Sequence, residues 1–99
     1  MKDDAGLFVL LLRMELVIPG ARSLKEKRGP LKSLKERIRS RFNVSIAEVA
    51  YRDKWQRALL AASMVGSERR HLETEAARLR QLVEETPDIQ PARIDMEWL

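Results

Sequence analysis

The sequence predicts an α+β domain whose elements follow the order β-α-β-β-α-β. Three observations support this order. Apolar side chains recur with the period of strands over residues 7–17, 44–51, 57–65 and 89–99. They recur with the period of helices over residues 24–42 and 68–85. Turn-forming residues, such as Pro19-Gly20 and Thr86-Pro87-Asp88, separate these segments. This is the order of the ferredoxin-like fold, in which a four-stranded antiparallel sheet carries two helices on one face.

The first strand, Leu7–Val17, has even-numbered residues on one face and odd-numbered residues on the other, and both faces are apolar in its first half. The third strand, Arg57–Val65, shares this property. Strands that are apolar on both faces are usually central in a sheet. Right-handed crossovers then place the second strand, Val44–Tyr51, and the fourth strand, Ile89–Leu99, at the edges. The fourth strand should turn Ile94, Met96 and Trp98 inward.

The first helix follows a capping box formed by Ser23 and Glu26. Its apolar stripe consists of Leu24, Leu31, Leu34, Ile38 and Phe42. Gly29-Pro30 interrupts the helix, because proline lacks an amide hydrogen and clashes with the preceding turn. We expect a kink there, or alternatively a short first turn followed by a separate helix from Pro30.

Three local features complete the predicted fold. Asn43 is expected to end the first helix in a left-handed conformation. A bulge is expected near Glu48-Val49 in the second strand. Ser67 is expected to be the N-cap of the second helix. The apolar stripe of that helix consists of Leu72, Ala76, Leu79, Leu82 and Val83.

The composition of the 99 residues excludes several classes of function. There is no cysteine and one histidine, His71, so thiolate catalysis and centres with several cysteine or histidine ligands are excluded. The longest apolar run, residues 7–12, is far shorter than the ~20 residues of a membrane helix. We expect a single cytoplasmic domain over residues 1–99, with a flexible N-terminus at residues 1–6. We expect no catalytic site, no cofactor, no metal and no membrane contact.

Positive charge is concentrated in the first helix and the turn before it. Residues 22–41 contain nine basic and two acidic residues, a net charge of +7, whereas the rest of the chain carries −3. The candidate nucleic-acid contacts, expected to converge on one strip, are Lys25, Lys32, Lys35, Arg39 and Arg41. RNA phosphates are one interpretation of this surface. A solvated surface that shields the core, an acidic protein and a membrane surface are the alternatives.

The sheet face opposite the helices is expected to be apolar and uncovered. The candidate oligomer interface on this face consists of Leu7, Val9, Leu11, Arg13, Leu59, Ala61 and Val65. Such a patch usually marks a contact surface. A second copy of the chain is the expected occupant, with Arg13 and Glu15 in ion pairs between subunits; another protein or the chain termini are the alternatives. The central strands carry no outward aromatic residue, which argues against the base stacking of RNA-recognition domains.

Tyr51 and Trp55 lie among positive charges in the turn between the second and third strands. This arrangement could stack a nucleic-acid base. The alternative is that Trp55 folds back over the core or an interface.

Three segments resemble the YlxP-like family, a bacterial domain family of unknown function. They are Glu15–Arg28 (ELVIPGARSLKEKR), Leu31–Val49 (LKSLKERIRSRFNVSIAEV) and Trp55–Ala58 (WQRA), with weaker agreement as far as Glu85. The resemblance implies a ferredoxin-like fold. The family's genes often lie beside those for translation initiation and ribosome maturation, which implies a role near RNA or the ribosome. Gly29-Pro30 departs from the family's uninterrupted helix, and no catalytic residue is implied.

Together these observations predict a non-enzymatic protein that contacts RNA or a ribosome-associated partner through the basic helix. The alternative is a homo-oligomeric structural or protein-interaction module without a nucleic-acid role.

Overall fold

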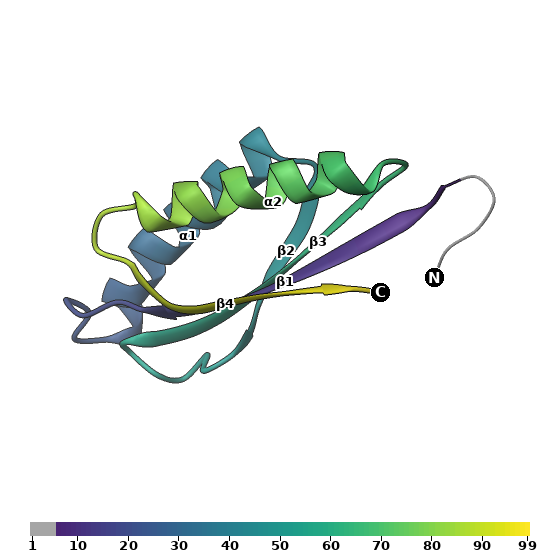
Figure 1. The fold of residues 1–99 in the computed structure, drawn as a ribbon. Coiled ribbons are helices and arrows are strands. Elements are labelled where there is room, and N and C mark those ends of the chain that lie inside the picture. Colours follow the sequence, from purple (N-terminus) through teal and green to yellow (C-terminus); the bar gives the residue numbers. More distant parts are fainter. Residues whose placement is uncertain (1–5) are drawn as a thin grey trace.

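A computed structural model describes residues 6–99 and has the predicted order of elements. The strands are β1 (Phe8–Val17), β2 (Val44–Ala50), β3 (Arg57–Gly66) and β4 (Gln90–Trp98), and the helices are α1 (Leu24–Arg41) and α2 (Arg69–Glu84). The strands form one antiparallel sheet in the order β2-β3-β1-β4, so β1 and β3 are central as predicted. Both helices lie on the same face of the sheet (Figure 1). The expected flexible N-terminus falls outside the described residues, except for Gly6.

The core lies between the helices and one face of the sheet. The even-numbered residues of β1 from Leu10 to Leu16 are buried, as are the even-numbered residues of β3 from Ala58 to Met64. The stripes of the two helices are also buried, and they contribute Leu31, Leu34, Ile38, Leu72, Ala76, Leu79, Leu82 and Val83. Period-two alternation in the strands therefore meets period-3.6 stripes in the helices, as the sequence predicts.

Helix α1 begins at the predicted capping box and is not divided by Pro30. The Ser23 hydroxyl accepts a hydrogen bond of 3.0 Å from the Glu26 amide, and the Glu26 carboxylate accepts one of 2.9 Å from the Arg22 amide. The helix continues from Leu24 to Arg41 with Pro30 inside it, so the alternative of two separate helices is wrong. Gly29 allows this, because it has no Cβ to clash with the following proline ring.

Two predicted helix ends are wrong. The C-cap of α1 is Phe42, which is extended (φ −130°, ψ 147°), and Asn43 is not among the residues with positive φ. The chain passes directly from α1 into β2, so it needs no left-handed residue there. The N-cap of α2 is Glu68, whose side chain makes no capping bond; Ser67 lies one residue before it.

The two sheet edges carry irregularities at different places. The predicted bulge in β2 is present, as a register shift between Glu48 and Ala50. The β1–β4 pairing shifts between Glu15 and Leu16, next to Pro91 of β4. Ile94, Met96 and Trp98 of β4 lie opposite Met14, Leu12 and Leu10, and therefore on the helix face. Ile94 and Trp98 are partly buried as predicted, whereas Met96 is 56% exposed. In the part of the chain that the structure describes, no helix is both long enough and apolar enough to span a membrane.

Candidate functional site

Helix α1 presents a row of positive side chains along one side. Successive residues of an α-helix are rotated by about 100°, which places Lys25, Lys32, Lys35 and Arg39 within an arc of about 80°. Arg28 falls inside the same arc. The row extends for about 21 Å along the helix axis at 1.5 Å per residue. We call these five residues (Lys25, Arg28, Lys32, Lys35 and Arg39) the basic strip.

The charges of the basic strip are largely uncompensated. Lys25, Arg28 and Lys35 form no ion pair with any of residues 6–99. Lys32 lies 4.0 Å from Glu36, and both side chains are well exposed, so this pair contributes little. The Arg39 guanidinium donates a 3.0 Å hydrogen bond to the Ile46 carbonyl of β2, which shows that the strip faces the β2 side of the molecule.

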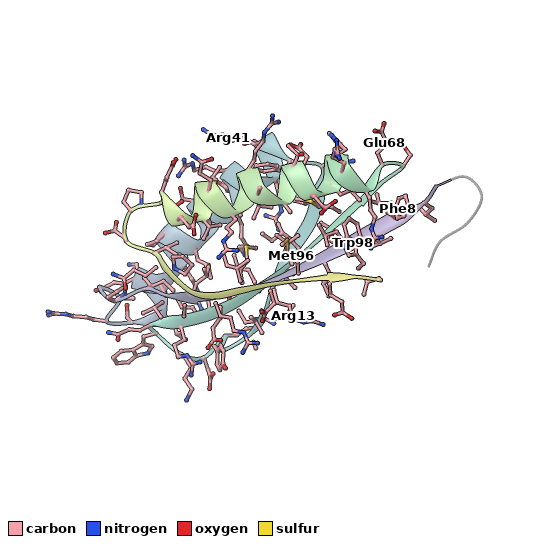
Figure 2. All side chains as sticks on the ribbon, in the orientation of Figure 1. Phe8, Arg13, Arg41, Glu68, Met96 and Trp98 are labelled. Atoms are coloured by element: carbon pink, nitrogen blue, oxygen red, sulfur yellow. The ribbon has the colours of Figure 1, made fainter. Side chains whose placement is uncertain are left out.

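Arg41 lies apart from the basic strip. With Arg37, it lines a hollow between α1 and α2, together with Arg78 and Glu75 of α2. Figure 2 shows Arg41 at the C-terminal end of α1, on the side of the helices away from the sheet. The structure therefore brings together four of the five predicted nucleic-acid contacts and adds Arg28 to them.

A buried lysine connects α1 to the β2–β3 turn. The Lys27 side chain is 3% exposed, and its ammonium lies 2.7 Å from the Glu48 carboxylate. The same ammonium donates a 2.8 Å hydrogen bond to the carbonyl of Tyr51, a residue with positive φ (61°). Sequence reasoning missed this pair. Its signal was Lys27 on the apolar stripe, four residues before Leu31, with Glu48 at an inward position of β2.

The aromatic residues of the β2–β3 turn adopt different environments. The Arg57 guanidinium lies 4.0 Å from the centre of the Tyr51 ring. A hydrogen bond from Arg57 to the Glu15 carboxylate raises the pKa of the Arg57 guanidinium. Trp55 is 54% exposed and therefore does not cover the core of its own chain.

The open sheet face, formed by the sides of the strands that point away from the helices, contains the predicted oligomer interface. Of its apolar residues, Leu7, Val9, Leu11, Leu59 and Ala61 are partly buried and Val65 is 52% exposed. Arg13 and Glu15, predicted to pair between subunits, are instead paired within the chain. Arg13 lies 2.8 Å from Glu97, and Glu15 contacts Arg57. Figure 2 shows Arg13 on the face opposite Met96.

The residues for which the structure gives a placement contain no group of three His, Asp or Glu side chains that could hold a metal ion. Two contact regions predicted from the sequence can be located on the described residues, the basic strip and the open sheet face.

Comparison with known families assigns the chain. The model of the family described as "Protein of unknown function (DUF503)" matches residues 9–96, which include every strand and both helices almost entirely. The chain belongs to this family. A relative of the chain is "Uncharacterized protein YlxP" of Bacillus subtilis (strain 168), which is 39% identical over 84 residues, covering 85% of this chain and 91% of the relative. The resemblance to the YlxP-like family is thus confirmed.

Among solved structures, the chain is similar to "De novo designed protein Foldit4". The TM-score is 0.55 and the identity is 10%, with 94% of this chain and 96% of the designed chain covered. At this identity the likeness concerns the fold alone. The function of this member of the DUF503 family must therefore be argued from its own surfaces.

Proposed function

We propose that this protein binds RNA without catalysing a reaction, by placing the basic strip of α1 along the phosphates of a single-stranded or looped segment. Free RNA and RNA in a ribosomal particle present the same phosphate chemistry. The observation that supports the proposal is the row of cations, exposed except for the partly buried Lys35 and mostly unpaired, on one side of an unbroken helix. A strip about 21 Å long spans several phosphates of a nucleic-acid strand.

The spacing within the basic strip favours a ligand over simple solvation. Its members follow one another at intervals of three, four, three and four residues, so each is a neighbour of the next on the helix surface. Like charges at these intervals destabilise a helix by about 0.2–0.5 kcal/mol per pair. A solubilising surface would have no need for this repulsion, and acids could be interspersed. A bound phosphate chain removes the repulsion.

The test is salt-dependent binding of fluorescently labelled single-stranded RNA and ribosomal RNA, measured by anisotropy. Each phosphate neutralised on a single strand contributes about −0.7 to the slope of log affinity against log salt. With three to five contacts we expect a slope of about −2 to −3.5. The variant Lys32→Glu/Lys35→Glu/Arg39→Glu should bind about 100-fold more weakly, because it loses three attractive contacts and gains three repulsive ones.

The matched control is Arg70→Glu/Arg78→Glu/Arg80→Glu, which changes the net charge equally through exposed residues of α2. It should retain most of the affinity. Arg39 donates a hydrogen bond to β2, so its replacement could disturb the fold. The double variant Lys32→Glu/Lys35→Glu keeps this hydrogen bond and tests the strip without that change. If the α1 and α2 variants weaken binding equally, total charge and not the strip is responsible. If neither does, the proposal is wrong.

The other candidate function is self-association, in which a second copy of the chain binds the open sheet face. The specific observation is that Val9 and Val65 lie directly opposite each other on a face that the helices do not cover, with Leu11 two residues along β1. Leu59, which was expected beside them, lies opposite Glu15 instead. Light scattering should then detect an oligomer at micromolar concentration, and Leu11→Lys should dissociate it. A monomer whose mass is unaffected by this substitution would exclude the open sheet face as an interface.

A further inference from the structure

Strand β4 leaves one side of its backbone without a strand partner. The Leu99 amide donates a 3.0 Å hydrogen bond to the Val9 carbonyl, which extends the β1–β4 register by one pair. Hydrogen-bonded and non-hydrogen-bonded pairs alternate in an antiparallel ladder. Arg93, Asp95 and Glu97 therefore bond to β1, and Ile94, Met96 and Trp98 direct their N–H and C=O groups outward. Among residues 6–99, no strand lies beyond this edge.

The other edge strand of the sheet, β2, is protected against pairing with another strand, unlike β4. The Arg39 guanidinium donates a hydrogen bond to the Ile46 carbonyl of β2, and the bulge near Glu48 interrupts the regular pairing of β2 with β3. Bulges, prolines and charged side chains, especially lysine, are the usual protections against pairing with another chain. On β4 the register shift and Pro91 protect only the beginning of the strand. From Arg93 to Trp98 the pairing with β1 is regular, and the segment contains no lysine and no proline.

The unprotected half of β4 also exposes apolar surface on the helix side of the sheet. Met96 lies opposite the fully buried Leu12, yet it is 56% exposed. Figure 1 shows β4 at the outer edge of the sheet, and Figure 2 shows the Met96 side chain on the helix face. Ile94 beside it is partly buried. These two side chains would be covered by a strand added at this edge.

We propose that the occupant of this edge is β4 of a second copy of the chain, paired antiparallel about a two-fold axis at Asp95. Ile94 then lies opposite Met96 of the partner subunit in a hydrogen-bonded pair, as its outward backbone groups require. Arg93 lies opposite Glu97 of the partner subunit in a non-hydrogen-bonded pair, where side chains are closest. Each of these pairs occurs twice because of the symmetry.

Neighbouring registers are less favourable. A slip by one residue would place the apolar side chains of one copy against the charged side chains of the other. A slip by two in one direction places Asp95 opposite Glu97 of the partner subunit twice, so that it has two like-charged pairs, whereas the proposed register has one and adds two pairs of Arg93 with Glu97 of the partner subunit. A slip by two in the other direction places Asp95 opposite Arg93 of the partner subunit, but it removes both Ile94–Met96 pairs and places Glu97 opposite Pro91 of the partner subunit, in the irregular part of the strand.

The charges around the proposed axis balance. Asp95 meets its own copy there, but its carboxylate lies 2.8 Å from the Arg93 guanidinium, and Arg13 lies directly opposite it on β1. Arg13 in turn lies 2.8 Å from Glu97. Each copy thus supplies two cations and two anions to a neutral network. The basic strip faces β2, at the other end of the sheet, so this pairing leaves it uncovered and its test is independent of RNA binding.

The chain contains no cysteine, so a single introduced cysteine reports the register directly. In a non-hydrogen-bonded antiparallel pair the Cα atoms are about 4.5 Å apart, within the range of about 4.4–6.8 Å for disulfides. Asp95→Cys should therefore form a disulfide-linked dimer in oxidised glutathione, seen by non-reducing electrophoresis. Ser45→Cys, an exposed position on the opposite edge strand, is the matched control, and it should cross-link at least tenfold more slowly.

A second measurement tests the proposed dimer without an introduced cysteine. Light scattering of the unmodified chain should show a dimer, and Met96→Lys should weaken dimerisation at least tenfold while the circular dichroism spectrum stays unchanged. Equal cross-linking of the Asp95→Cys and Ser45→Cys chains would overturn the proposal. So would a chain that stays monomeric, or a dimer that Leu11→Lys dissociates and Met96→Lys does not.

Discussion

Truncation of Leu12 to alanine is expected to lower the free energy of unfolding by about 3–4 kcal/mol, whereas truncation of its neighbour Leu11 should cost about 1 kcal/mol. Leu12 is fully buried between the helices and the sheet, so its removal leaves a cavity that rigid neighbours cannot fill. Leu11 lies on the open sheet face beside Ser63 and Glu97, where water replaces the lost atoms. The same substitution at adjacent positions thus measures the two faces of β1.

Urea denaturation of both variants, in dilute solution where the chain is monomeric, provides the measurement. The dependence of stability on urea should be equal in the two variants, since neither changes the surface exposed on unfolding by much. Equal losses of about 3 kcal/mol would contradict the placement of Leu11 on an uncovered face. A loss at Leu11 that grows with protein concentration would instead indicate that the open sheet face is buried in an oligomer.

The fold could be predicted because its determinants are local and repeated. Apolar residues on both faces of β1 and β3 indicate central strands, and the stripe from Leu31 to Ile38 indicates which side of α1 is buried. The wrong predictions concern points where a local preference competes with the path of the chain. Asn43 can adopt a left-handed conformation, but the direct passage from α1 into β2 requires extended backbone. Pro30 usually ends a helix, but here the buried stripe on both sides of it keeps α1 continuous.

The candidate site was predictable in its charge and less so in its geometry. The concentration of lysine and arginine in α1 is visible in the sequence, and four of the five predicted residues share one side of the helix. Arg41 follows Arg39 by two residues, or about 200° around the helix, so it could not belong to the same strip. The partners of Arg13 and Glu15 depend on the register between strands that are distant in sequence, which periodicity alone does not give.

Replacement of Lys27 by methionine is expected to lower the free energy of unfolding by about 3 kcal/mol, although the side chain keeps nearly the same size. The variant loses the ammonium that lies between the Glu48 carboxylate and the Tyr51 carbonyl. Glu48 has a side chain only 17% exposed, so its charge would remain largely buried without a partner. Lys32→Met is the matched control. Its side chain is 76% exposed, and the change should cost no more than about 0.5 kcal/mol.

The double variant Lys27→Met/Glu48→Leu separates the cost of an unpaired charge from the stability of the pair itself. Desolvation of a buried ion pair offsets much of its attraction, so an apolar pair of similar volume should restore most of the lost stability. The coupling energy from the complete cycle should then be about 2–3 kcal/mol. A Lys27→Met chain as stable as the unmodified one would show that the ammonium does not hold α1 to the β2–β3 turn. A double variant less stable than Lys27→Met would show that the unpaired Glu48 carboxylate costs less than its replacement by leucine, which would contradict the expected penalty of a buried charge.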